Sequence, residues 1–154
     1  MKKHNFIDIA IFVLSAELVG VVSALLSGGF GDFYDKFTAP PLLPPSWLFP
    51  VVWTILYAVM GFSAYLIYSS EADKTKCLVI YWAQLTVNFF WIIVFFRFEE
   101  LWAGVVVILI LLALIIAMIN CFRKIRPLAA LINIPYLIWV SFATYLTIAI
   151  AIIN

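Results

Sequence analysis

Long runs of apolar residues, separated by short polar or proline-rich segments, dominate this sequence. Five such runs of roughly 20 residues each occur along the chain. An α-helix of about 20 residues crosses the ~30 Å hydrocarbon layer of a bilayer. The pattern therefore predicts an all-α integral membrane bundle of five transmembrane helices, formed by a single domain of residues 1–154. We expect the spans at about 6–26, 47–68, 77–96, 101–122 and 129–153.

The composition agrees with a chain immersed in lipid. Of the 154 residues, 67% are hydrophobic and only 11% are charged. About a quarter of the residues of a soluble domain are charged, so this chain cannot cover itself with a solvated surface. Lys2 and Lys3 precede the first apolar run, as in a signal peptide. That run exceeds the ~7–15 apolar residues of a signal peptide and four more runs follow, which favours a retained first helix.

Lysine and arginine predict the orientation, because they are enriched on the cytoplasmic side of membrane proteins. Seven lie on the amino-terminal side of the predicted bundle and two lie on the opposite side. These are Lys2, Lys3, Lys74, Lys76, Arg123, Lys124 and Arg126 on the first side, and Lys36 and Arg97 on the other. We therefore expect a multi-pass protein of the cell membrane, with a cytoplasmic amino terminus and an external carboxyl terminus.

Several function classes receive no support from the sequence. The net charge of +1 gives no reason to expect nucleic-acid binding. His4 stands alone, so no metal site is expected. Cys77 and Cys121 fall at predicted cytoplasmic helix ends and lack C-x-x-C spacing, which predicts free, reduced thiols. No nucleophile–base set or glycine-rich phosphate loop is evident.

The first connection, residues 27–46, reads SGGFGDFYDKFTAPPLLPPS and is too aromatic for a loop that only contacts water. Long aromatic loops in compact proteins are usually functional, and we predict a lid over one end of the bundle. The alternative is an interfacial aromatic anchor. Prolines restrict the backbone, so we expect P-P-L-L-P-P to be stiff and extended. Pro50 should lie in the first turn of the second helix, whose rotation then directs Trp53 and Tyr57 inward.

Aromatic, small and polar residues share one face on each of three predicted helices, within arcs of about 60–80° at 100° per residue. The faces comprise Trp53, Tyr57, Gly61, Ala64 and Tyr68; Gln84, Asn88, Trp91 and Phe95; and Pro135, Trp139, Ala143 and Leu146. Amides in lipid need partners, so the Gln84–Asn88 face must point into protein or a cavity. Either these amides only bond neighbouring helices, or the three faces surround a site for a flat aromatic ligand.

Glu17 is a carboxylic acid near the middle of the first predicted span. Its charged form would cost about 2.5–3.5 kcal/mol there on insertion scales, so it should face the interior or be protonated. It is a candidate proton or cation site, and a structural hydrogen bond is the alternative. Gly20, Ser23 and Ala24 could allow close contact with another helix, including one of a second protomer, and the lipid-facing side of the third predicted helix is the alternative surface for contact between protomers.

Three segments of the sequence resemble the translocator protein family, also called tryptophan-rich sensory proteins or peripheral benzodiazepine receptors. They are PPSWLFPVVWTILYAVMG, QLTVNFFW and PYLIWVSFATYL, on predicted spans two, three and five. The resemblance implies a five-helix bundle, usually dimeric, with a ligand cavity beneath the first loop. It implies binding of porphyrins such as protoporphyrin IX, of benzodiazepines and of isoquinoline carboxamides. Some bacterial members are reported to promote light-dependent porphyrin degradation.

Carried over onto this sequence, the family pattern predicts a set of ligand-binding residues. They are Tyr34, Pro44, Pro45, Trp53, Asn88, Trp91, Trp102, Trp139, Ala143 and Leu146, and Tyr57 joins them from its shared face with Trp53. Trp102 could instead be a membrane anchor. Trp53 and Trp139 are the candidates for photochemistry, because an indole can donate an electron to an excited porphyrin.

The sequence departs from the family pattern at three places. Leu42 stands where the family often has tryptophan, and Ile92-Ile93-Val94 replaces a proline-rich stretch. Thr147 replaces the usual asparagine near the end of the last span, and the Tyr and Arg of the cholesterol motif are absent. Cholesterol is therefore not an expected ligand.

The leading hypothesis is a membrane-embedded, homodimeric binding protein for porphyrins and similar aromatic molecules. Porphyrin is a ligand in this hypothesis, and no resident cofactor is expected. A porphyrin-degrading enzyme would share the same pocket. The rival from the transporter class is a small proton-coupled exporter of aromatic compounds that uses Glu17.

Overall fold

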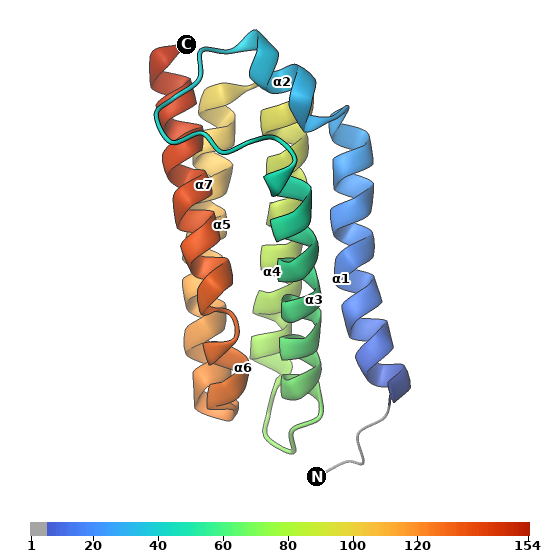
Figure 1. The fold of residues 1–154 in the computed structure, drawn as a ribbon. Coiled ribbons are helices and arrows are strands. Elements are labelled where there is room, and N and C mark those ends of the chain that lie inside the picture. The colour runs from blue at the N-terminus through green and yellow to red at the C-terminus, as the bar shows by residue number, and fades with distance from the viewer. Residues whose placement is uncertain (1–5) are drawn as a thin grey trace.

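The computed structural model describes residues 6–154, so Lys2, Lys3 and His4 lie outside the described part of the chain. Its long helices are α1 (Phe6–Ser27), α3 (Leu48–Tyr68), α4 (Thr75–Ile92), α5 (Leu101–Ile125) and α7 (Ile134–Ile153), which run side by side (Figure 1). Shorter elements are α2 (Phe30–Lys36), the π-helical turn η1 (Ile93–Arg97) and α6 (Pro127–Leu131). Within these residues, five helical segments are long and apolar enough to cross a membrane. The all-α membrane bundle is confirmed.

Two breaks lie around the start of the last predicted span, residues 129–153. Arg126 is extended, with φ −148°, and ends α5 immediately before Pro127. Proline disfavours the helical conformation of the residue before it, which explains the break. A second break separates α6 from α7, and there the buried Asn133 side chain donates a 2.8 Å hydrogen bond to the Ala129 carbonyl. The chain thus turns through α6 before α7 begins.

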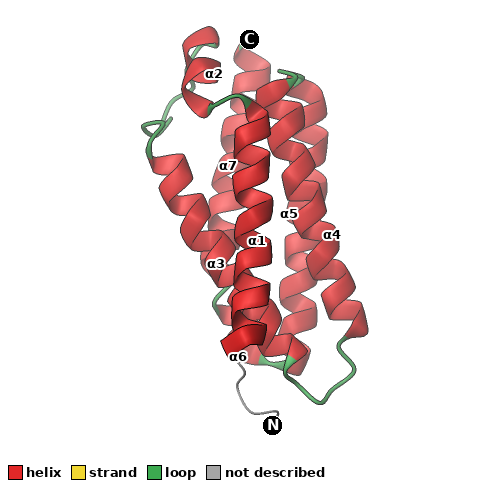
Figure 2. Cartoon of the chain, turned by 90° about the vertical axis from the view of Figure 1, so that its right-hand side faces the viewer, coloured by secondary structure: helices red, strands yellow, loops and turns green. Residues whose placement is uncertain are grey.

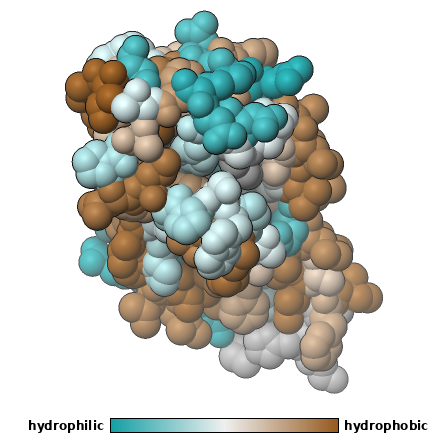
Figure 3. All heavy atoms as spheres, turned by 45° about the horizontal axis from the view of Figure 1, so that its top comes forward, coloured by the Kyte–Doolittle hydropathy of each residue, from teal (hydrophilic) through white to brown (hydrophobic). Residues whose placement is uncertain are grey.

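Apolar side chains cover both the interior and the flanks of the bundle. α1 packs mainly against α3, α4 against α5, and α5 against α7 (Figure 2). Large apolar residues such as Ile11, Leu14 and Leu18 on α1 are exposed on the outer surface. Figure 3 shows hydrophilic residues gathered at the end that carries α2, above hydrophobic flanks. An apolar outer belt with polar ends is the surface expected of a protein surrounded by lipid.

Helices α1 and α3 approach closely at two glycines. A Cβ atom at Gly61 would lie 2.5 Å from the Phe12 carbonyl oxygen and 2.6 Å from the Val13 Cα atom. A Cβ atom at Gly20 would lie 2.4 Å from the Tyr57 ring. Gly20 and Ser23 are buried. The predicted close-packing surface is therefore occupied at Gly20 by α3 of the same chain, and the homodimer stays a prediction.

The loop of residues 27–46 lies across one end of the bundle and contains the helix α2, which we did not predict (Figure 1). Phe33 is 2% exposed, and its ring centroid lies 4.9 Å from those of both Phe95 and Phe96. Four polar contacts join the loop to the rest of the protein. They are the Lys36–Glu99 ion pair, the bond from the Thr38 N–H to Asn154 Oδ1, the bond from Asn154 Nδ2 to the Thr38 carbonyl and the bond from the Tyr145 hydroxyl to the Pro41 carbonyl.

The prediction that the proline-rich segment is extended throughout was wrong. The Leu43 N–H donates to the Pro40 carbonyl at 3.4 Å, and Leu42 has φ +67°. Proline at the second position and a positive φ at the third are the features of a type II turn. Pro41 presets the first requirement and Leu42 meets the second, so the segment bends. Pro50 does lie in the first turn of α3, as predicted.

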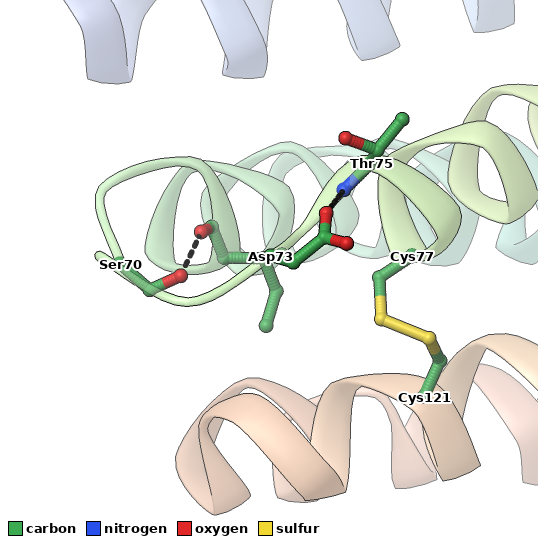
Figure 4. The surroundings of a disulfide bond; sticks show 6 residues. Ser70, Asp73, Thr75, Cys77 and Cys121 are labelled. Carbon is green, nitrogen blue, oxygen red and sulfur yellow. Dashed lines mark hydrogen bonds between the residues drawn. A yellow bond between two sulfur atoms is a disulfide. The ribbon is translucent and has the colours of Figure 1, made fainter.

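The prediction of free thiols was also wrong. Cys77 on α4 and Cys121 on α5 form a disulfide, with their Cα atoms 5.5 Å apart (Figure 4). The prediction relied on compartment and on C-x-x-C spacing, and it ignored the antiparallel pairing of the two helices. Cys77 lies 22 residues before Glu99 and Cys121 lies 22 residues after it. Because the chain reverses direction between α4 and α5 at this point, the two cysteines return to the same level.

Mass tagging checks this disulfide. The denatured, unreduced protein should take no maleimide–polymer tag, and prior reduction should expose two sites for tagging. The Cys77→Ser variant should take one tag with or without reductant if no other thiol partner is present. Two tags on the unreduced wild-type protein would show that the thiols are free.

Candidate functional site

A small cavity lies beneath the loop, and we call it the aromatic chamber. Its volume is about 10 Å³. It is lined by Tyr34, Phe49, Trp91, Phe95, Phe96, Ala143, Leu146, Thr147 and Ile150. Four of the predicted ligand-binding residues thus meet here from α2, α4 and α7, namely Tyr34, Trp91, Ala143 and Leu146. The faces predicted on the third and fifth spans do converge.

The π-helical turn explains how two consecutive phenylalanines both line the chamber. In an α-helix, neighbouring side chains diverge by about 100°. In η1 the Phe98 N–H donates to the Ile93 carbonyl five residues earlier, at 3.1 Å, and both Phe95 and Phe96 are buried. The wider turn begins at Ile93, within the Ile92-Ile93-Val94 stretch. π-turns within helices are frequent at functional sites.

Trp53 and Trp139 flank the chamber as a second aromatic layer. The Trp53 ring centroid lies 6.1 Å from that of Trp91, and the Trp139 centroid lies 5.7 Å from that of Phe49. Phe49 in turn stacks on Tyr34, with centroids 5.5 Å apart. Both tryptophans are therefore one ring away from the space that Ala143 lines.

Two indole N–H groups near the chamber lack an acceptor. The Nε1 atoms of Trp91 and Trp139 are buried and have no hydrogen-bond partner among the described residues 6–154. An indole N–H can only donate, and buried donors are normally paired. These two groups could therefore donate to an oxygen or nitrogen atom of a bound molecule.

A buried polar network crosses the bundle below the chamber and uses the predicted amides. The Tyr57 hydroxyl donates to Asn88 Oδ1 at 2.6 Å, and Asn88 Nδ2 donates to the Tyr136 hydroxyl at 3.1 Å. The Tyr136 hydroxyl donates to Gln84 Oε1 at 2.8 Å. The network thus ties α3, α4 and α7 together, which favours the alternative that these amides bond neighbouring helices. A ligand would have to compete with a tyrosine for Asn88.

Tyr136 is a network residue that the sequence analysis missed. It precedes Ala143 by seven residues, which places the two within about 20° on one helix face. Trp139, which we did assign to that face, lies about 40° away by the same arithmetic. Helical spacing alone was therefore sufficient to assign Tyr136 to the same face as Ala143.

The remaining predicted residues lie apart from the chamber. Trp102 is 62% exposed on α5, a position that fits the membrane-anchor alternative. Pro44 is half-buried and Pro45 is exposed in the loop before α3. Trp139 also borders an outward-facing groove between α3 and α7, together with Val52, Ile55, Leu56, Pro135, Ile138 and Phe142.

The chamber is chemically simple. Its lining is aromatic and aliphatic apart from the hydroxyls of Tyr34 and Thr147 and the indole N–H of Trp91. Thr147 donates to the Ala143 carbonyl within α7. Burial raises the pKa of the Tyr34 hydroxyl, which therefore stays neutral at physiological pH. The residues in and around the chamber can stack on a flat ring, donate hydrogen bonds through indoles and supply an electron from an indole.

Comparisons with known proteins give one consistent family. The model of the TspO/MBR family matches residues 11–153. "Protein CrtK" of Rhodobacter capsulatus is 32% identical over 149 residues, which cover 94% of this chain and 91% of that protein. "Tryptophan-rich protein TspO" of Chlorobaculum tepidum is 35% identical, with 79% of each chain covered. The bovine "Translocator protein" is 30% identical, with 86% of this chain and 81% of that protein covered.

Proposed function

Because this chain belongs to the TspO/MBR family of membrane proteins, we propose that it binds porphyrins such as protoporphyrin IX within the membrane. Benzodiazepine-type and isoquinoline carboxamide molecules are the proposed synthetic ligands of the same site. The observation that carries this proposal is the aromatic chamber under the loop, where Tyr34, Trp91 and Ala143 meet from three helices.

Ligand entry requires the chamber to expand. Its volume of about 10 Å³ is far below the ~300–1,000 Å³ of ordinary ligand sites. The loop that covers it is the element best suited to move, because its four polar contacts with the bundle are all exposed. Its ring contacts with the bundle join Phe33 and Tyr34 to Phe49, Phe95 and Phe96. We therefore propose that residues 27–46 act as a lid that opens for the ligand.

The two unpaired indole donors support the same ligand classes. Protoporphyrin IX carries carboxylates, and carboxamides carry a carbonyl oxygen, so both offer acceptors. Burying a donor without an acceptor is unfavourable, and pairing it removes that penalty. Trp91 and Trp139 would therefore favour a ligand with an acceptor over an equally flat hydrocarbon.

Light-dependent degradation is a further step that we propose for bound porphyrin. Trp53→Phe and Trp139→Phe should retain most porphyrin binding, since phenylalanine keeps a stacking face and aromatic pairs contribute only about 0.5–1.5 kcal/mol beyond area burial. Both variants should bleach bound porphyrin several-fold more slowly under illumination. Phenylalanine is a much poorer electron donor than indole.

The measurement compares bleaching rates at equal occupancy, with dark samples as the baseline. Trp102→Phe is the matched control, because Trp102 is exposed and does not line the chamber, and it should bleach porphyrin at the wild-type rate. Wild-type bleaching rates in both Trp53→Phe and Trp139→Phe would show that these indoles only line the site and do not donate the electron.

We propose that the amino terminus and the α3–α4 connection are cytoplasmic, following the count of lysine and arginine. The disulfide lies at that same end of the bundle, and disulfides are uncommon in the cytosol. The two features therefore favour opposite assignments. We retain the charge-based one because it sums seven side chains against two.

Cysteine labelling decides the orientation. In a Cys77→Ser/Cys121→Ser background, a cysteine at Asp35 should be labelled by an impermeant reagent from outside intact cells. A cysteine at Thr75 should be labelled only after permeabilisation. The reverse pattern would place the amino terminus outside the cell. The disulfide would then also lie outside, where disulfides are common.

The exporter hypothesis and the homodimer remain proposals of lower rank. Glu17, on which the exporter depends, lies in a groove on the outer surface of the bundle and not in the aromatic chamber. The two functions would therefore use different sites.

Detergent-corrected light scattering that returned the mass of a single chain would contradict the dimer.

A further inference from the structure

A second cavity lies between α1 and α3, and we call it the lateral groove. Its volume is about 280 Å³, and it is lined by Glu17, Gly20, Val21, Ala24, Leu25, Pro50, Trp53, Thr54, Tyr57 and Ile92. Val21 and Leu25 are 53% and 76% exposed, so the groove opens on the outer surface of the bundle. That surface faces the bilayer, and a ligand could enter the groove sideways from lipid.

Glu17 is the one carboxylate among the residues that line this groove, and it lies at the end farthest from the loop. Tyr57 packs against Gly20, one helical turn from Glu17, while Leu25 and Pro50 lie toward the loop. From Glu17 to Leu25 the groove extends roughly 12 Å along α1, at 1.5 Å per residue. A carboxylate thus ends an apolar slot about as long as a two-ring aromatic molecule.

Every polar side chain of the groove has a contact within the chain, and that of Glu17 is with the backbone of Ala58. The Thr54 hydroxyl donates to the Pro50 carbonyl at 2.8 Å, and the Tyr57 hydroxyl donates to Asn88. Within residues 6–154, no lysine or arginine forms an ion pair with Glu17. A charged carboxylate at this depth in lipid is unfavourable unless a cation accompanies it.

From this arrangement we infer that the lateral groove binds a small lipophilic amine, whose ammonium group pairs with Glu17 and whose aromatic body lies against Trp53. An ammonium–carboxylate contact combines charge with hydrogen bonding, which is stronger than either group achieves with a neutral partner. Trp53 supplies an aromatic surface at the floor of the groove. The volume is just below that of drug-sized sites, so the occupant is smaller than a porphyrin.

This site is independent of the proposed porphyrin site, although Trp53 borders both regions. Ala143, Leu146 and Trp91 line the aromatic chamber and are absent from the groove. Glu17 and Ala24 line the groove and are absent from the chamber. Substitutions at Glu17 and Ala143 therefore separate the two sites. An acyl chain of a lipid is the competing occupant of the groove, and it would be indifferent to the charge of Glu17.

The test uses a matched pair of probes, 2-(1-naphthyl)ethylamine and 2-(1-naphthyl)ethanol, with the full-length protein in lipid nanodiscs at neutral pH. Calorimetric titration should show the amine binding at least about tenfold more tightly than the neutral alcohol. Glu17→Gln should remove this preference by weakening amine binding about tenfold and leaving alcohol binding unchanged. Asp8→Asn, which removes another α1 carboxylate outside the groove, should keep the wild-type preference.

Two further variants locate the site. Ala24→Phe should fill the groove and weaken both probes, while Ala143→Leu should leave amine binding at the wild-type level and affect only protoporphyrin IX. Equal affinity for amine and alcohol in the wild-type protein, or an unchanged amine affinity in Glu17→Gln, would overturn the proposal. A loss of amine binding in Ala143→Leu would do the same, because it would place the amine in the aromatic chamber.

Discussion

Replacing Ala143 with leucine is expected to weaken protoporphyrin IX binding by about 10- to 100-fold. Ala143 is 4% exposed and contributes its methyl group to the wall of the aromatic chamber. Overpacking a site with a larger side chain costs about 1–3 kcal/mol, and each 1.4 kcal/mol corresponds to a tenfold change in affinity. Fluorescence titration in the dark measures the effect.

Ser141→Leu is the matched control for this substitution. Ser141 is a small residue on the same helix, but it is exposed on the outer surface. It should therefore accept leucine with wild-type porphyrin affinity. If Ala143→Leu bound porphyrin as tightly as Ser141→Leu, the ligand would have to bind somewhere other than the chamber.

Gly61→Ala is expected to destabilise the folded protein by about 2 kcal/mol, within the ~1–3 kcal/mol range for overpacking. The new Cβ atom would lie 2.5 Å from the Phe12 carbonyl oxygen and 2.6 Å from the Val13 Cα atom. Both are backbone atoms, so a rotamer change cannot relieve the clash. Helix α1 would have to move away from α3, and the thermal midpoint in detergent should fall by several degrees.

Gly31→Ala provides the comparison. Gly31 lies within α2, and a Cβ atom there would meet nothing within 4 Å. Alanine has the higher helix propensity, so this variant should match or slightly exceed the wild-type thermal midpoint. A Gly61→Ala midpoint equal to that of Gly31→Ala would mean that α1 and α3 are not in close contact in the folded protein.

The sequence was sufficient to predict the five spans, because span length and apolarity are summed over about 20 residues. Individual errors at Thr75 or Ile125 shift a boundary without removing a helix. The convergence of Trp91 and Ala143 was also predictable, since helical spacing assigns residues to faces. The network alternative for Gln84 and Asn88 could be stated from the sequence, but choosing it required the positions of two tyrosine hydroxyls.

Features set by contacts between distant segments were not predictable in the same way. Helix α2 is short, and its Phe33 is buried against the π-turn of a different span. That π-turn follows no proline or glycine signal in Ile92-Ile93-Val94. The bend at Leu42 requires a positive φ, which leucine rarely adopts, so its presence in the sequence does not predict the bend. The Cys77–Cys121 bond could have been predicted from the sequence, because the two cysteines lie at equal distances along the chain from the reversal between α4 and α5.

The direct test of the porphyrin proposal is a competition titration of the unmodified protein in the dark. Protoporphyrin IX should bind saturably, one molecule per chain, and quench tryptophan fluorescence. An isoquinoline carboxamide should displace it competitively and restore that fluorescence. Binding that fails to saturate, or a carboxamide that binds without displacing the porphyrin, would contradict a shared site under the loop.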